Sequence, residues 1–122
     1  MAQTLVKSER LSSKTAISDL LKNGRWITAG CLKCCYLHHP EGSQDRILVS
    51  VPKRNFKRAV KRNLLKRRIR ESYRTQKDLL RPAAGSVDVM FFYNIKDIAD
   101  FGTVSADLAQ AMTMVRNKIS GV

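Results

Sequence analysis

The sequence predicts an α+β two-layer sandwich, in which a small β-sheet packs against helices in the order αββαβα. Three observations support this class. Some stretches place apolar residues at steps of three and four, others are rich in strand formers bounded by turn residues, and 122 residues suit one hydrophobic core. No repeat, low-complexity stretch or long linker interrupts the pattern. We therefore expect a single domain over residues 1–122, with the helices on one face of the sheet.

The first half of the chain predicts a helix and then two strands. A serine pair at 12–13 can cap a helix whose apolar residues recur at helical spacing until Asn23-Gly24 ends it. Strand formers dominate residues 31–37 and 46–51, and strong turn formers lie between them. We expect these two segments to pair as a β-hairpin.

The second half predicts a helix, a strand and a helix. Pro52 ends the second strand because proline cannot donate a ladder hydrogen bond, and the pattern over residues 56–76 is helical and strongly basic. Pro82 breaks the chain again before residues 87–93, which alternate in the manner of a strand. Ser105 then offers an N-cap to a last helix that runs to the end.

Charge is the strongest compositional signal. The chain has 23 Lys and Arg against 10 Asp and Glu, which gives a net charge of +13 and a pI near 10.2. Such a surface binds polyanions. No stretch reaches the ~18 apolar residues that a membrane span needs, and the first ten residues lack the apolar core of a secretory signal. Three cysteines within residues 31–35 fit a reducing compartment, so we expect a cytoplasmic protein.

About half of the basic charge lies in one segment of 22 residues, where the only acid is Glu71. The basic residues of this segment are Lys53, Arg54, Lys57, Arg58, Lys61, Arg62, Lys66, Arg67, Arg68, Arg70 and Arg74. Repulsion between like charges one turn apart destabilises an isolated helix, so a partner must offset it. We expect Glu71 to form an ion pair with a neighbouring cation.

The helical positions of these residues separate a polar face from an apolar one. An arc of roughly 60° collects side chains with hydrogen-bond donors, namely Asn63, Arg67, Arg70 and Arg74. A different line carries Leu65, Ile69 and Tyr73, which can dock on the sheet. The planar guanidinium meets phosphate oxygens with two hydrogen bonds and stacks on bases, so RNA fits this face well. A membrane-surface helix needs a broad apolar face, and DNA binding lacks a helix-turn-helix or zinc finger here.

Residues 53–71 closely resemble the signature of the bacterial ribonuclease P protein family. That signature is a basic pair followed by Ala-Val-x-Arg-Asn-x-x-Lys-Arg-x-x-Arg-Glu. The matching residues are Ala59, Val60, Arg62, Asn63, Lys66, Arg67, Arg70 and Glu71. Residues 17–24 are similar to the family's Phe-x-x-Val-Phe-x-x-Gly segment, although Ile17 and Leu21 replace its aromatic residues.

The resemblance implies a fold and a function. The fold is a small sheet with a left-handed βαβ crossover through the arginine-rich helix and a concave cleft beside it. The function is that of an accessory subunit, inactive alone, of an enzyme whose RNA subunit and bound Mg²⁺ remove the 5′ leader of precursor tRNA. The protein itself would bind no metal. The basic residues of segment 53–74 and Asn63 would contact RNA, and the cleft would hold the single-stranded leader, with Tyr36 and Ala59 as candidate contacts.

Two other chemical readings are weaker. Cys31-x-x-Cys34-Cys35 before His38-His39 offers zinc ligands, but a two-residue strand period puts Cys31 and Cys34 on opposite faces. Buried thiols explain these cysteines better, with Cys34 and Tyr36 on one face of the strand and Cys31 and Cys35 on the other. A nuclease site of the protein's own would need clustered carboxylates, and the scattered aspartates at 97, 100 and 107 have no partner motif.

Two classes of function stay open. The chain is either a subunit of a tRNA-processing ribonucleoprotein or a structural RNA binder such as a ribosomal protein or assembly factor. The Arg-Asn-x-x-Lys-Arg-x-x-Arg-Glu spacing favours the former.

Two interpretations of Trp26 also stay open. Trp26 could stack on a base, or it could pack across the end of the preceding helix. The oligomeric state of the free protein is left undetermined.

Overall fold

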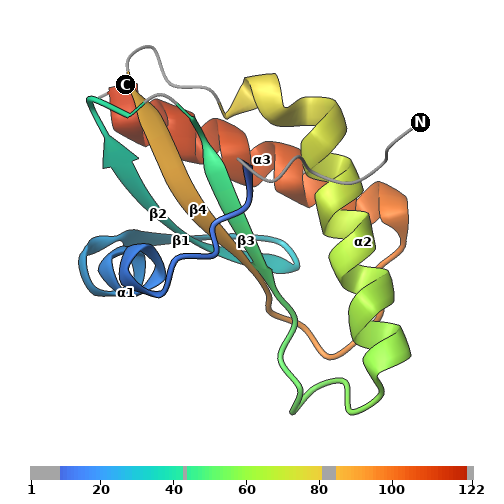
Figure 1. Ribbon diagram of the computed structural model, residues 1–122. Coiled ribbons are helices and arrows are strands. Elements are labelled where there is room, and N and C mark those ends of the chain that lie inside the picture. The colour runs from blue at the N-terminus through green and yellow to red at the C-terminus, as the bar shows by residue number, and fades with distance from the viewer. Residues whose placement is uncertain (1–8, 43, 81–84, 121–122) are drawn as a thin grey trace.

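A four-stranded sheet with the order β1-β2-β4-β3 forms the centre of the computed structural model, which describes residues 9–42, 44–80 and 85–120 (Figure 1). The elements are α1 (Lys14–Asn23), β1 (Arg25–Ala29), β2 (Leu32–His39), β3 (Arg46–Ser50), α2 (Ala59–Gln76), the 3₁₀ turn η2 (Lys77–Leu79), β4 (Ser86–Tyr93) and α3 (Phe101–Ser120). The predicted fold class and the order of the predicted elements are confirmed. β1 is an additional strand.

The predicted hairpin of residues 31–37 and 46–51 is wrong, because β4 lies between those strands. β2 pairs with β4 in antiparallel fashion, and β3 pairs with β4 in parallel. Seven of the eight residues of β4 are buried, so a central position removes both of its faces from water. The shorter β3 has alternating burial and takes the outer position.

The hairpin that does form joins β1 to β2 through Gly30. This residue has φ of +58°, and a Cβ atom there would lie only 2.2 Å from Oδ2 of Asp107. The same oxygen accepts a hydrogen bond of 2.9 Å from the backbone nitrogen of Cys31. Glycine is therefore required twice, for the left-handed backbone and for the approach of α3. β1 escaped prediction because three of its five residues are exposed, which is ordinary for a short edge strand.

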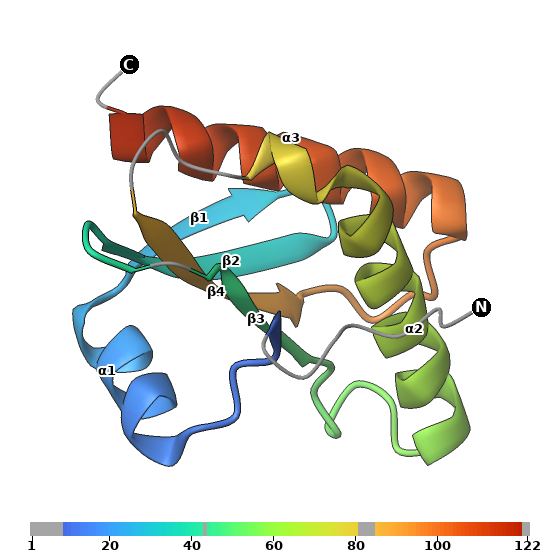
Figure 2. The ribbon, with the colours of Figure 1, turned by 45° about the horizontal axis from the view of Figure 1, so that its top comes forward.

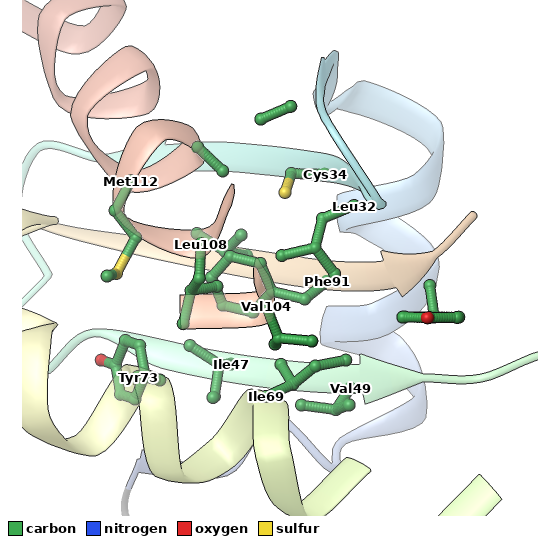
Figure 3. Packing of buried hydrophobic residues seen from close by; sticks show 14 of the residues in the cluster. Leu32, Cys34, Ile47, Val49, Ile69, Tyr73, Phe91, Val104, Leu108 and Met112 are labelled. Atoms are coloured by element: carbon green, nitrogen blue, oxygen red, sulfur yellow. The ribbon is translucent and has the colours of Figure 1, made fainter. Parts of the chain in front are cut away.

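Helices cover both faces of the sheet, which differs from the expected one-sided packing. α2 and α3 lie on one side and α1 lies on the other (Figure 2). Figure 3 shows Tyr73 and Ile69 of α2 and Leu108 and Met112 of α3 directed toward the same side of the sheet. A smaller cluster beneath α1 contains Leu11, Leu20, Cys35 and Met90. The sheet therefore has one fully covered face and one that α1 covers only in part.

Two helices begin elsewhere than predicted. α2 starts at Ala59 rather than at residue 56, because Phe56 is buried with its ring centroid 5.7 Å from that of Tyr93. α3 starts at Phe101, and the Thr103 backbone nitrogen donates to Oδ1 of Asp100 at 2.7 Å. The predicted Ser105 cap is wrong, because Asp100 supplies the capping oxygen five residues earlier.

All three cysteines are buried, as predicted. Cys31 nevertheless shares a cluster with Cys34 and Tyr36, so its predicted placement on the opposite face is wrong. The reason is that Cys31 lies in the turn before β2, where strand alternation does not apply. Burial raises the pKa of the Cys34 thiol to about 12, and burial together with Asp107 does the same for Cys31.

The described residues contain neither a metal-binding group nor a membrane-spanning helix. Across ranges 9–42, 44–80 and 85–120, no three of the His, Cys, Asp and Glu side chains gather into a group that could hold a metal ion. In the same ranges, no helix combines the length and the hydropathy needed to cross a bilayer.

Candidate RNA-binding site

The apolar side of α2 fixes which of its cations face outward. Leu65, Ile69 and Tyr73 are buried in the main core, as their spacing predicted. The ring of Tyr73 lies 6.3 Å from that of Phe91 on the central strand. Because this side is held against the sheet, the residues roughly opposite to it cannot turn inward.

The predicted polar arc is mostly exposed. Asn63, Arg67 and Arg70 are exposed along one flank of α2, and Lys66 and Arg74 beside them are half-buried. Nε of Arg74 donates to Oε2 of Glu71 at 3.1 Å, which confirms the predicted ion pair. Arg74 lowers the pKa of Glu71, mainly through this hydrogen bond. We name Asn63, Lys66, Arg67 and Arg70 the outer flank.

Two other arginines of α2 bind the protein itself. One terminal nitrogen of Arg62 donates to the carbonyl oxygens of Phe56 and Lys57, at 2.7 and 2.8 Å. A terminal nitrogen of Arg68 donates to the carbonyl oxygen of Ala99 at 2.6 Å. Arg62 thus closes the loop that enters α2, and Arg68 holds the loop that leads to α3. The sequence assigned both to RNA contact and did not reveal these internal partners.

The N-terminal segment adds a cation that the sequence analysis missed. Arg10 forms a parallel bridge with Ile47 on the outer edge of β3, and the backbone nitrogen of Leu11 donates to the Ile47 carbonyl at 2.9 Å. Arg10 is exposed and lies close to Arg70. The pKa of Arg70 is lowered mainly by its partial burial and, to a smaller extent, by the like charge of Arg10. Arginine stays protonated at neutral pH in spite of this, so both charges persist. No local pattern predicts this meeting, because it depends on strand pairing.

A salt bridge beside Arg10 anchors the same segment to the far end of α2. Nζ of Lys77 lies 3.0 Å from Oε2 of Glu9, and the Glu9 side chain is buried. The segment is therefore tied to β3 by backbone hydrogen bonding and, by charge, to η2 at the C-terminal end of α2. Arg10 extends the outer flank toward the sheet.

The loop before α2 carries the remaining predicted cations. Lys53, Arg54, Lys57 and Arg58 are exposed there, and Lys61 is exposed in the first turn of the helix. That first turn has no acidic residue, and its N-cap residue makes no side-chain hydrogen bond to the helix. A helix start without a side-chain cap and five exposed cations therefore share one end of α2, which favours anions.

The partly covered face of the sheet presents one open row of side chains. Strand register aligns Thr28, Lys33, Phe92 and Ser50 across all four strands. Thr28 and Lys33 are exposed, and Phe92 and Ser50 are half-buried. Ser50 ends β3, so the chain continues from this row directly to Lys53 and Arg54. The open row thus connects the β1 edge with the basic loop.

The two predicted cleft residues lie apart from each other. Tyr36 is on the α3 side of β2 with only 6% of its surface exposed, and it borders a hollow whose other lining residues include Lys118 and Ile119. None of the described residues that line this hollow belongs to α2. Ala59 is exposed at the first turn of α2. On β2, the side chains on the partly covered face of the sheet are instead those of Lys33, Cys35 and Leu37.

Fold and surface together define a small basic α+β protein whose crossover helix presents an array of cations suited to RNA. The family model described as Ribonuclease P matches residues 5–117. The chain belongs to the ribonuclease P protein family.

Individual relatives agree with this assignment. The ribonuclease P protein component of Porphyromonas gingivalis strain ATCC 33277 is 31% identical over 121 residues, which cover 94% of this chain and 88% of the relative. The RNase P protein of Thermotoga maritima has a similar structure, with a TM-score of 0.73 at 22% identity, covering 87% of this chain and 96% of that one. A mutant Staphylococcus aureus RNase P protein gives the same TM-score and identity and covers 95% and 91%.

Proposed function

We propose that this chain is the protein subunit of a bacterial ribonuclease P, and that the outer flank of α2 contacts the catalytic RNA. The observation that carries the proposal is the division of α2 into a buried apolar side and an exposed flank whose Asn63, Arg67 and Arg70 fall on the family signature. Arg67 and Arg70 can each meet a phosphate with two hydrogen bonds, and Asn63 adds both a donor and an acceptor.

The open row offers a path for the single-stranded leader of precursor tRNA. Phe92 presents part of an aromatic ring, Lys33 presents an ammonium group, and the row ends at Lys53 and Arg54. Single-strand binders combine these two chemistries, with rings stacking on bases and cations following the backbone. The proposal therefore assigns the leader contact to Lys33 and Phe92 in place of the largely buried Tyr36.

In this proposal the RNA subunit holds the Mg²⁺ ions, which supply the activated water and stabilise the leaving oxygen. The protein contributes by neutralising phosphates at two places, along the outer flank and along the open row. Bringing the RNA subunit and the leader together on one rigid protein lowers the entropic cost of aligning them. Because the bound cations reduce the repulsion between phosphates of the two RNAs, cleavage requires a lower Mg²⁺ concentration.

Cleavage of a 5′-labelled precursor tRNA by the cognate RNA, at low Mg²⁺, tests the proposal. We expect the wild-type protein to stimulate cleavage and the double variant Arg67→Ala, Arg70→Ala to lose most of that stimulation. The double variant Lys22→Ala, Arg116→Ala is the matched control, because it removes two exposed cations from α1 and α3. A wild-type protein that stimulates no cognate RNA would favour a structural RNA binder, such as a ribosomal protein or assembly factor.

A further inference from the structure

Trp26 is a large aromatic side chain that the core does not use. It is the only tryptophan of the chain, and 44% of its surface is exposed. Strand register places it opposite Cys35 on β2, at the edge of the sheet formed by β1. It belongs to neither of the two buried clusters in the described residues. The exposed part of the ring leaves apolar area that a partner could bury.

The surroundings of Trp26 are cationic. Nζ of Lys33 lies 5.0 Å from the centroid of the ring, a cation–π distance. The hollow of about 660 Å³ that Trp26 borders is also lined by Arg25 and Lys118, both exposed. An apolar protein partner would have to bury these charges, whereas a nucleotide brings a flat ring and a phosphate together. The local chemistry therefore matches single-stranded RNA.

Trp26 also lies in line with the proposed leader path. Lys33 belongs to the open row, where it pairs with Thr28 on one side and Phe92 on the other. Its ammonium group also lies over the Trp26 ring, so it connects the row to that ring. Three inter-strand spacings of about 4.8 Å separate β1 from β3, so the ring lies about 14 Å across the sheet from the edge beside α2. A strand that enters at the basic loop must cross the open row before it reaches Trp26.

We propose that Trp26 and Lys33 form a stacking platform for one base of the precursor leader, at the end of its path farthest from α2. This inference rests on the proposed function. Trp26 covers one face of the base, and Lys33 neutralises the neighbouring phosphate. Only leaders long enough to cross the sheet reach the platform, so it discriminates among substrates by leader length.

The holoenzyme, assembled from this protein and its cognate RNA, provides the test. Because Trp26 is the sole tryptophan, its fluorescence reports directly on the platform. Titration with a long-leader precursor should quench the emission, and a precursor whose leader is too short should not. Trp26→Ala should weaken binding of the long-leader precursor about tenfold and leave the short one unchanged, because stacking on one base contributes this much in other single-strand binders.

Two variants serve as controls. Trp26→Phe should retain most of the long-leader affinity, because it keeps a ring at the site. Phe101→Ala removes an equally exposed aromatic ring at the start of α3 and should change neither affinity. Equal effects of Trp26→Ala on both precursors, or quenching by the RNA subunit alone, would overturn the inference. A holoenzyme whose wild-type protein gives no stimulation would instead count against the proposed function.

Discussion

Two pairs of arginines on the same helix have opposite roles. Arg62 and Arg68 are half-buried and donate to backbone carbonyls, Arg62 in the loop that enters α2 and Arg68 in the loop between β4 and α3. Arg67 and Arg70 are exposed, and the side chain of neither makes a hydrogen bond or ion pair in the part of the chain that the structure describes. All four carry the same charge, and 67 and 68 are adjacent. What separates the pairs is their angle from the buried line of Leu65 and Ile69.

The comparison shows that a basic helix is more than a uniform source of charge. Some of its arginines build the support that holds the others in place. Removing an inner arginine should therefore lower stability, and removing an outer one should lower RNA affinity. Variants of the inner and the outer arginines distinguish these two effects.

The largest effect is expected for the outer pair. Arg67→Ala, Arg70→Ala should weaken binding of the catalytic RNA roughly 100-fold, because two bidentate phosphate contacts disappear. The midpoint of thermal unfolding should stay the same or rise slightly, since Arg10 no longer faces Arg70. Filter binding and calorimetry measure the two quantities. A large fall in Tm would show that the outer arginines also support the fold.

The next effect concerns Arg68. Arg68→Ala should lower the free energy of unfolding by about 1.5 kcal/mol, because the half-buried Ala99 carbonyl loses a charge-assisted hydrogen bond. Urea unfolding measures this change. Arg68→Lys should recover part of the loss, whereas RNA affinity should change less than threefold in either variant. Weaker RNA binding without loss of stability would place Arg68 with the outer pair.

Salt dependence sharpens the comparison for single residues. Arg67→Ala should reduce the slope of log K against log salt by about 1, because one phosphate contact no longer releases a counterion. Arg62→Ala should leave the slope nearly unchanged, since its guanidinium is engaged with the carbonyls of Phe56 and Lys57. Equal slopes for both variants would contradict the division drawn here.

The smallest effect is expected for Glu71. Because Arg74 lowers the pKa of Glu71 in the folded protein, the ion pair stabilises the fold above the ordinary pKa of glutamate. That contribution is lost as the pH falls through the lower folded pKa. Glu71→Gln should therefore lower Tm slightly at pH 7, and this difference should shrink as the pH falls through the lowered pKa of Glu71. A difference that stays constant on acidification would point to a role other than the ion pair.

Local sequence patterns predicted the elements whose residues interact with near neighbours along the chain. The spacing of Leu65, Ile69 and Tyr73 indicated the buried side of α2, and the alternation over residues 87–93 indicated β4. The hairpin prediction failed because strand pairing depends on the whole set of strands, and the most buried strand occupies the centre. The cap of α3 was misplaced because two candidate capping residues, Asp100 and Ser105, lie within one turn and a half.

The candidate site also has one part that local sequence patterns predicted and another part that depends on the tertiary structure. The outer flank followed from helical spacing and from the family signature, since both depend on residues along one helix. Arg10 could not be found in this manner, because β3 pairing carries it to Arg70 from sixty residues away. The inward bonds of Arg62 and Arg68 depend on loop conformation, and the open row depends on the register of four strands. Tyr36 was selected for its ring, and the pleat of β2 turned that ring toward α3.

The central position of β4 has a consequence for synthesis of the protein. β4 begins only at Ser86, so a growing chain makes both of its neighbouring strands and the whole of α2 before the strand that joins them exists. Until then the apolar side of α2 has no finished sheet to cover it, and pairing must wait for contacts between distant segments. The fold and the display of the outer flank are therefore completed together, and only after β4 has been made. A nascent chain that stops short of Tyr93 has the arginines but not the scaffold that orients them.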